Sequence, residues 1–421
     1  MRFTTVIARL LGVERTVIEG VEFEGVELVV RVRPRWSERK RCGVCRRRCG
    51  GYDDGAGRRR WRGLDWGTTR VFLEADAPRV ECALHGVVAA SVPWARHDSR
   101  FTRAFEDTCA WLVVHTSRTA VAELLRIAWR TVGGICARVA AEAEARTDRF
   151  ATLRRIGIDE IAHRKGHRYL TVVVDHDTGL LIWAAPGHDA ATLHAFFDLL
   201  GPDRCGKVEL VSADGAGWIA DVVAQRCPKA RRCMDPFHVV AWATRALDEV
   251  RREVWNEARR QGLMAEAREL KGARFALWKN PEDLTDRQAA KLSQIARTNA
   301  KLYRAYLLKE QLRQVFRLPW RAAMRLLDRW LAWASRSRIG AFVEVARSIR
   351  RHYDAIRDAL ANDLSNARTE SINTRIRVHT RQAFGFHSPE AMIAIAMLSL
   401  GGLCPPLPGR EPSFNGPRQR Q

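Results

Sequence analysis

Residues 154–176 read RRIGIDEIAHRKGHRYLTVVVDH, and the fold of the chain follows from this stretch. Isoleucines that alternate with small or polar residues predict a buried strand over 155–162, which carries Asp159 and Glu160 near its end. After a basic turn, a run of β-branched and aromatic residues predicts a second strand over 169–174. A carboxylate beside a core costs free energy unless a partner compensates its charge. We therefore expect a divalent metal ion or a basic side chain next to these acids.

The residues that follow predict an alternation of strands and helices. A third strand comes first, and then a helix, a strand, a second helix and a fifth strand. Three adjacent strands followed by this alternation is the element order of the ribonuclease-H-like fold, an α/β fold with a mixed sheet. Asp159 and Asp214 would end its first and fourth strands, which are neighbours at the centre of that sheet. The predicted strands are 179–185, 208–213 and 230–234, and the predicted helices are 189–200, with Asp189 as N-cap, and 218–225.

A third acid is expected on a helix late in the chain, within residues 362–385. Ser365 or Asn366 can cap this helix, because a short polar side chain accepts hydrogen bonds from the first backbone amides. One face of the helix has the spacing i, i+3, i+4 and i+7. Its members are Glu370, Asn373, Thr374 and Arg377.

Three sequence blocks, in this order, resemble the DDE transposases of bacterial insertion sequences, specifically the ISL3 family. They are SADG at 212–215, MDPFHVV at 234–240, and SNARTESINTRIR followed by RQAFGF within 365–386. The opening IDE…RKGHRY…VVD is similar to that family too. The resemblance covers nearly the whole chain, and the three blocks together are specific where one alone would not be.

The resemblance implies an enzyme that binds the terminal inverted repeats of its insertion sequence and then cleaves and transfers DNA strands. Such chemistry needs an activated water or 3′-hydroxyl and neutralisation of charge at phosphorus, which two Mg²⁺ (or Mn²⁺) ions about 4 Å apart provide. Mg²⁺ keeps several of its waters, so three carboxylates suffice. Asp159 would bridge the two ions, and Asp214 and Glu370 would each hold one.

Other acids compete for these roles. Asp175 could replace Asp159, although Asp159 fits the strand order better, and Asp235 could replace Asp214. In similar transposases an Asp followed three positions later by His comes just after the fifth strand. Asp235 and His238 match that pattern, so we expect them to support the site from beside the metal ligands.

The composition points to a polyanionic partner. The chain has 421 residues and a net charge of +23, whereas its hydrophobic content of 46% is that of a globular protein. Each Lys or Arg that meets a phosphate releases a counterion, so double-stranded DNA is the expected partner. The sequence shows no signal peptide, no long apolar run and no basic amphipathic helix long enough to favour a membrane surface. We therefore expect a bacterial cytoplasmic protein that associates with the nucleoid through DNA and does not bind a membrane.

Two pairs of metal-ligating residues lie near the N-terminus. Cys42 and Cys45 are separated by two residues, as are Cys82 and His85, and a short β segment lies between the pairs. This spacing is typical of a tetrahedral structural Zn²⁺ site with three thiolates and one imidazole. Cys49 is an alternative ligand, and the ISL3 family more often has Cys at the fourth position.

The segment after the cysteines predicts a helix-turn-helix. Residues 119–125 form the first helix, 126–128 the turn, and 129–139 the recognition helix. An ordinary helical hairpin is the alternative, and the pair Gly133-Gly134 is unfavourable inside a helix.

Together with the remaining segments, the chain is expected to consist of six parts. Alternating residues over 17–33 predict β structure at the start, and the helical insertion is predicted to contain helices at 239–255, 285–307, 310–315 and 319–333. Thr285 and Gln288 have the spacing of a capping box. The parts are a zinc-finger domain (1–95), the helix-turn-helix (96–148), the first part of the catalytic core (149–238), the insertion (239–361), the last part of the core with Glu370 (362–403) and a disordered tail (404–421).

DNA contacts are expected from basic and polar side chains in several parts of the chain, and the two DNA ends imply at least a dimer in the active complex. Two functions are the alternatives to an active DDE transposase. One is a DNA-binding protein derived from a transposase whose site has decayed, and the other is a different ribonuclease-H-like nuclease. Arg130 and Thr131 are the expected base readers near the start of the recognition helix. The other expected contacts are Arg46, Arg47, Arg48, Arg58, Arg59, Arg60, Lys165, His167, Asn373 and Arg377.

Overall fold

The computed structural model describes residues 3–164, 166, 168–383, 386 and 388–410. The chain forms two compact units, Met1–Arg149 with Arg375–Gln421, and Phe150–Thr374. The residues after Thr374 thus group with the N-terminal unit, and the predicted six-part division stays a prediction. Lys165, His167 and the end of the predicted tail from residue 411 lie outside the described residues.

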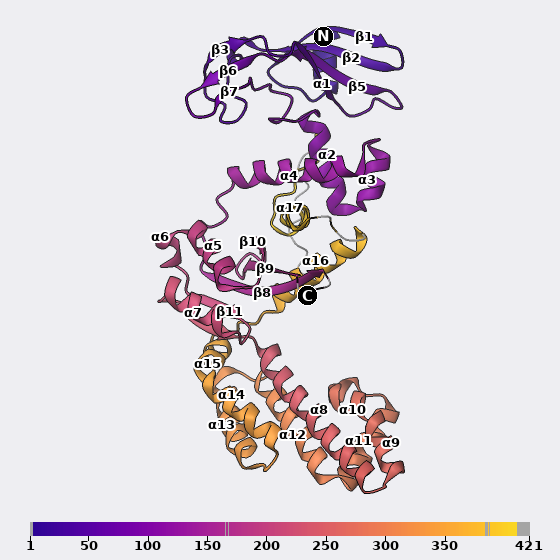
Figure 1. Cartoon of the computed structure of the whole chain (residues 1–421), viewed down its shortest axis with the longest axis vertical. Coiled ribbons are helices and arrows are strands. Elements are labelled where there is room, and N and C mark those ends of the chain that lie inside the picture. The colour runs from indigo at the N-terminus through magenta and orange to yellow at the C-terminus, as the bar shows by residue number, and fades with distance from the viewer. Residues whose placement is uncertain (1–2, 165, 167, 384–385, 387, 411–421) are drawn as a thin grey trace. The chain divides into compact units, whose positions relative to one another are not determined.

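The first unit begins with two small sheets. The alternation over 17–33 forms the hairpin of β1 (Thr16–Glu24) and β2 (Glu27–Pro34), which turns at Gly25 with φ of 61°. A four-stranded sheet has the order β1-β2-β5-β4, with β4 at Arg58–Arg62 and β5 at Arg70–Asp76. The short helix α1 (Phe3–Leu10), which the sequence analysis did not predict, packs against β1. The second sheet has the order β3-β6-β7, at Gly50–Asp53, Arg79–Cys82 and Gly86–Ala89 (Figure 1).

The predicted helix-turn-helix is present and has a third helix before it. Helices α2 (Arg103–His115), α3 (Arg118–Leu124) and α4 (Trp129–Arg146) follow one another, and α4 is longer than predicted. Arg126 makes the turn with φ of 55°. The C-terminal helix α17 (Pro389–Leu400) packs against α4 and α2, so this helical core combines both ends of the chain.

The glycine pair in α4 has a packing reason. A Cβ atom at Gly133 would lie 2.9 Å from Nη2 of Arg118, whose side chain is buried. The Arg118 guanidinium stacks 3.8 Å from the centre of the Trp129 ring. Gly133 therefore lowers the stability of the helix, but its missing side chain leaves room for Arg118 of α3 to pack against α4.

The second unit is built on a five-stranded mixed sheet with the order β10-β9-β8-β11-β12. The first three strands along the chain are antiparallel neighbours, and β11 runs parallel to both β8 and β12. All five strands were predicted, but β8 continues beyond the predicted end at Ala162. Its hairpin pairing with β9 extends to Arg164, so Asp159 lies within the strand and not at its end. The strands are β8 (Arg155–Arg164), β9 (Arg168–Asp175), β10 (Leu181–Pro186), β11 (Leu210–Ala213) and β12 (Arg231–Met234).

The two faces of this sheet differ in character. Ile156, Ile158 and Val211 point into an apolar core with α5 (Ala190–Leu200) and α7 (Gly217–Arg226). The predicted N-cap of α5 is confirmed, since the Asp189 carboxylate accepts from the Thr192 amide at 2.8 Å. The opposite face carries Gly157, Asp159 and Ser212 among buried apolar residues, and it lies against α15 (Tyr353–Ala361) and the start of α16 (Ala367–Gln382).

The insertion is helical throughout its regular structure, as predicted. The predicted helix over 285–307 is two helices, because the chain breaks at Asn299, which caps the second. The capping box is confirmed: the Thr285 amide donates to Gln288 Oε1 at 3.1 Å. The helices are α8 (Pro236–Arg260), α9 (Met264–Gly272), α10 (Arg274–Trp278), α11 (Asp286–Thr298), α12 (Ala300–Val315), α13 (Trp320–Arg336), α14 (Gly340–Arg351) and α15 (Figure 1).

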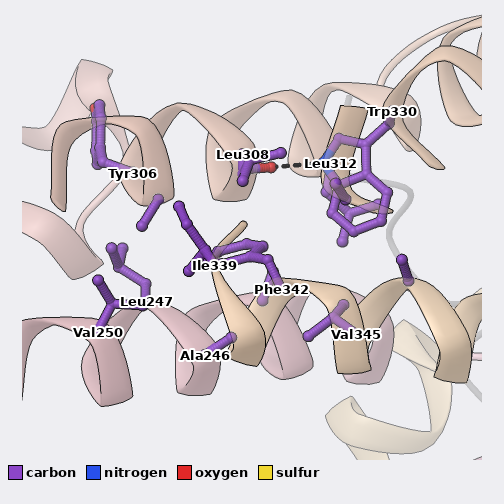
Figure 2. Close-up of a cluster of buried hydrophobic side chains, with 14 of the residues drawn as sticks. Ala246, Leu247, Val250, Tyr306, Leu308, Leu312, Trp330, Ile339, Phe342 and Val345 are labelled. Carbon is purple, nitrogen blue, oxygen red and sulfur yellow. Dashed lines mark hydrogen bonds between the residues drawn. The ribbon is translucent and has the colours of Figure 1, made fainter. Parts of the chain in front are cut away.

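One apolar core joins the helices of the insertion. Figure 2 shows Leu247 and Val250 of α8 facing Leu308 and Leu312 of α12, together with the ring of Trp330. The Trp330 indole is fully buried and donates from Nε1 to the Leu308 carbonyl at 2.8 Å, which fixes α13 against α12. In the described part of the chain no helix is long and apolar enough to cross a membrane.

A glycine in β8 allows α16 to approach the sheet. A Cβ atom at Gly157 would overlap Oγ1 of Thr369 and lie 2.8 Å from Nε2 of His176, and both side chains are buried. Neither neighbour can move toward solvent. The separation of α16 from β8 is thus set by the missing side chain at Gly157.

Gly157→Ala should lower the free energy of unfolding by about 1–3 kcal/mol, because overpacking a closed core forces the backbone apart. The matched control is Gly20→Ala in β1, where an added Cβ would meet no atom within 4 Å. Thermal unfolding followed by circular dichroism compares the two variants. Equal stability of both variants would contradict the packing role of Gly157.

Candidate functional site

Two acids lie side by side on the face of the mixed sheet that α15 and α16 cover. In the parallel pairing of β11 with β8, Ser212 lies opposite Gly157. Asp159 and Asp214 each follow two residues later, and alternate residues of a strand point to the same face. Both carboxylates are half-buried. Asp214 comes directly after β11, as predicted, and its carboxylate accepts from the Ala216 amide at 2.9 Å.

Helix α16, which carries Glu370, contacts this face of the sheet. Asn373 donates from Nδ2 to Oδ2 of Asp159 at 2.8 Å. Glu370 precedes Asn373 by three residues and therefore lies on the same side of the helix, one turn closer to its start. Asn373, predicted as a DNA contact, is buried and bonds to an acid of the site. Arg377 of the same predicted face is exposed.

Burial and neighbouring acids raise the pKa of two carboxyl groups at this site, Asp159 and Glu160. Burial is the main reason that the pKa of Asp159 is raised, and the carboxylates of Asp214 and Asp235 add to the rise. Burial and the neighbouring Asp214 and Asp159 raise the pKa of Glu160 to about 7. A group of carboxylates that disfavour one another's ionisation is a site where a cation is stabilised. The donor set of half-buried carboxylates also suits Mg²⁺, a hard ion that prefers oxygen ligands.

Asp235 and His238 flank this acid group. Asp235 is buried at the N-terminus of α8, and its carboxylate is 2.8 Å from Nδ1 of His238. The hydrogen bond to Asp235 raises the pKa of His238, and the carboxylates of Asp214 and Asp159 raise it further. Positive charge on His238 in turn lowers the pKa of Asp159. Both residues thus lie near Asp159 and Asp214.

A chain of buried polar side chains supports the start of α16. Nε2 of His176 is 2.6 Å from the Ser212 hydroxyl, which donates to Oδ1 of Asn366. The Asn366 amide donates to Asp235 at 3.3 Å, and the Asn366 carbonyl accepts from the Glu370 amide at 2.7 Å. These contacts tie β11, α8 and α16 together directly beneath the acids. Burial lowers the pKa of His176 to about 4, so this histidine is neutral at pH 7.

Asp175, the other candidate for the first acid, has a local structural task. It is buried, and its carboxylate accepts from the Asp177 amide at 2.9 Å and from the Thr178 hydroxyl at 2.7 Å. These bonds hold the turn between β9 and β10. No role was predicted for His176 or Ser212, and Asn366 was predicted only as a possible helix cap. A small polar residue at a buried strand position, such as Ser212, is a signal that could have marked this network.

The four predicted zinc ligands come together. Ligand atoms of Cys42, Cys45, Cys82 and His85 all lie within 4.8 Å of one another. In the part of the chain that is described, Asp159, Asp214 and Glu370 do not form so tight a group. Cys49 does not belong to the group either; its thiol donates to the Arg47 carbonyl at 3.3 Å.

The distances between these atoms fit tetrahedral zinc. Zn–S bonds of about 2.3 Å and Zn–N bonds of about 2.0–2.1 Å give S–S edges of about 3.8 Å and S–N edges of about 3.6 Å. The Sγ atoms of Cys45 and Cys82 are 3.8 Å apart, and Nδ1 of His85 is 3.6 Å from Cys42 Sγ and 3.5 Å from Cys82 Sγ. His85 would therefore bind through Nδ1.

Local structure explains why the sequence forms this site. A Cβ atom at Gly43 would lie 2.5 Å from both the Ala89 carbonyl and the His97 ring, so the loop between the first two cysteines needs glycine there. The backbone amide of Leu84 and the side chain of His85 lower the pKa of Cys82 to about 6. Thiolate is the form of cysteine that binds metal, so the loop favours the ligating state.

The remaining predicted DNA contacts have different surroundings. Arg130 is exposed and Thr131 half-buried in the first turn of α4. The side chains of Arg46, Arg47 and Arg48 are exposed around the zinc site. Within the first unit, Arg58 and Arg60 pair with Glu74 at 3.1 and 2.8 Å, and Arg59 donates to the Ser99 carbonyl at 2.9 Å.

Comparison with protein families gives three matches along the chain. The ISL3-type DDE model, described as a transposase, matches residues 156–396. The helix-turn-helix domain of transposase family ISL3 matches residues 90–140, and the zinc finger of transposases IS204/IS1001/IS1096/IS1165 matches residues 38–85.

Curated proteins give the same result. The transposase for insertion sequence element IS1557 of Mycobacterium tuberculosis (strains CDC 1551 / Oshkosh and ATCC 25618 / H37Rv) is 58% identical, with 98% of each chain covered. The transposase for insertion sequence element IS1001 of Bordetella parapertussis is 28% identical over 90% of this chain and 92% of that protein.

An acid-bearing mixed sheet joined to a helix-turn-helix and a zinc ribbon is the domain set of a DDE transposase. The chain belongs to the ISL3 family of these enzymes. The resemblance predicted from the sequence blocks is therefore confirmed, and so are the enzyme class and the helix-turn-helix.

Cys42→Ser should lower the zinc content of the purified protein from about one ion per chain to well below one, because a tetrahedral site with three remaining ligands binds the metal weakly. The matched control is Cys49→Ser, which removes a neighbouring thiol outside the group. Elemental analysis of both proteins measures the ratio. If Cys49→Ser lost zinc and Cys42→Ser retained it, the ligand set would be wrong.

Proposed function

We propose that this transposase cleaves DNA at the ends of its own insertion sequence and joins the freed ends to target DNA, with Asp159, Asp214 and Glu370 as the catalytic acids. The observation that carries this proposal is the hydrogen bond between Asn373 and Asp159. It ties the side of α16 that carries Glu370 to the sheet face on which Asp159 and Asp214 are neighbours. Acids from three distant parts of the chain are thus directed to one place.

The sheet supports a ribonuclease-H-like core. If its five strands are numbered 1 to 5 as they follow one another along the chain, they lie side by side in the order 3-2-1-4-5. The first three are antiparallel neighbours, and the fourth runs parallel to the first. This is the topology predicted from the element order. The acids at the first and fourth strands lie at its centre, where two neighbouring parallel strands present side chains to the same face.

The proposed metal ligands divide the work as follows. Asp159 would be shared by two Mg²⁺ or Mn²⁺ ions, while Asp214 and Glu370 would each hold one. When bound, such ions activate the attacking water or 3′-hydroxyl and offset the charge on the reacting phosphate. Asn373 orients the Asp159 carboxylate, and Asp235 holds His238 beside it.

We further propose a division between recognition and catalysis. The exposed Arg130 and the neighbouring Thr131 would read base edges in the terminal inverted repeats, because the start of a recognition helix enters the major groove. The exposed arginines around the zinc site would contact phosphates. Lys165 and His167, which lie outside the described residues, remain candidate DNA contacts. Two DNA ends must be processed together, so the active complex would contain at least two copies of the chain.

Glu370→Gln should abolish cleavage of DNA that carries the element's ends, because an amide does not hold a divalent ion as a carboxylate does. Binding of the same DNA should be unchanged. The control is Glu209→Gln, an exposed acid at the start of β11 that pairs with Arg154. The assay incubates each protein with DNA flanking its own gene and Mg²⁺, and maps the strand ends. Wild-type cleavage that survived in Glu370→Gln would remove this residue from the proposed triad.

Arg130→Ala should reduce the preference for terminal-repeat DNA over random DNA by about 10- to 100-fold, since one base contact contributes about 1–3 kcal/mol of discrimination. Arg47→Ala should weaken binding of both DNAs by a similar factor and leave their ratio intact. Titration of each full-length variant on both DNAs provides the two ratios. A changed ratio for Arg47→Ala alone would place base reading in the zinc ribbon.

A further inference from the structure

The helical insertion presents a row of arginines that the proposed recognition and catalytic sites do not use. Four arginines of α13 are exposed. Helices turn about 100° per residue, so the four fall within an arc of about 80°. They span 15 residues, or about 22 Å along the axis at 1.5 Å per residue. The row consists of Arg321, Arg325, Arg329 and Arg336.

The opposite side of α13 is fixed in the core, so the row cannot turn inward. Ala323, Leu327, Trp330, Leu331 and Ala334 are the buried residues of the helix, and they occupy an arc of about 100° on the far side from the arginines. Trp330 locks this orientation through its hydrogen bond to the Leu308 carbonyl (Figure 2). The arginine row is therefore held in a defined position by a rigid bundle.

These arginines differ from others in the insertion because no acid neutralises them. Within the described residues, none of the four makes an ion pair or a hydrogen bond. The acid at the edge of the row, Asp328, accepts from the Tyr353 hydroxyl at 2.8 Å instead. Residues 320–351 contain eight arginines and only two acids, Asp328 and Glu344. Four other arginines of the insertion do have acidic partners: the exposed Arg252, Arg260 and Arg347, and the half-buried Arg357.

We propose that this face of α13 binds the phosphate backbone of a DNA duplex without reading its sequence. Duplex DNA carries about one negative charge per 1.7 Å of axis, so about 22 Å of helix can meet many phosphates. Ala332 is one of the exposed residues between the arginines. None of these exposed residues is an Asn or a Gln, which are side chains that would read a base edge. This proposal rests on the proposed function in one respect, which is that the polyanion bound by the chain is DNA. It adds a second DNA-binding surface outside the zinc ribbon and the helix-turn-helix.

The test compares two full-length variants with the same loss of charge. The first, R321Q/R325Q/R329Q/R336Q, removes the row, and the second, R252Q/R260Q/R347Q/R357Q, removes the four ion-paired arginines. A random duplex and a terminal-repeat duplex are each titrated between about 50 and 200 mM salt. Each lost phosphate contact should reduce the slope of log affinity against log salt by about 0.9.

For the row variant we expect a slope shallower by about 3.6 on both duplexes. The wild type would then lose about 100-fold more affinity than the variant over this salt range. The ion-paired variant should change the slope by less than about 1. R321K/R325K/R329K/R336K should restore binding, which separates loss of charge from loss of fold.

An unchanged slope in the row variant, or equal changes in both glutamine variants, would overturn the proposal. So would an effect confined to the terminal-repeat duplex, because that result would mean sequence reading. None of these measurements depends on strand cleavage. Failure of the catalytic proposal, seen as wild-type protein that binds but does not cleave, is thus distinguishable from failure of this one.

Discussion

The close contact between β8 and α16 is the constraint on which the rest of the catalytic unit depends. Gly157 has no side chain, so buried Thr369 and His176 reach the strand, and Asn373 can donate to Asp159 two positions further on. Carboxylates repel one another and cannot assemble themselves. The acids are therefore brought together by packing and by neutral hydrogen bonds, which leaves their charge available to a cation.

The support beneath the acids is polar but carries little charge. His176 is neutral at pH 7 because burial lowers its pKa to about 4. Its partner is the Ser212 hydroxyl, which donates in turn to Oδ1 of Asn366. Hydrogen bonds in such a low-dielectric setting rigidify the elements they join. A neutral network also leaves the electrostatics of the site to its own residues, the carboxylates and the His238 imidazole.

Arginine serves three separate purposes in this basic chain. Arg58 and Arg60 neutralise Glu74 within a sheet, and Arg118 is buried against an aromatic ring as part of the helix-turn-helix core. Others, such as Arg130 and the row on α13, are exposed. Net charge alone therefore does not locate a DNA-binding surface. The informative property is an exposed guanidinium without an acidic partner, held in place by the packing behind it.

The sequence by itself determined the five strands, the Glu370 helix, the capped start of the insertion helix at Thr285 and the paired zinc ligands. Each of these depends on local periodicity, capping or ligand spacing, which a short segment contains. Only the tertiary structure decided that β8 continues to Arg164, that α17 packs with the N-terminal helices and that Asn373 is buried against Asp159. These outcomes depend on which strand pairs with which and on how closely two faces approach. No local pattern encodes such distances, because they are set by side chains far apart in the chain.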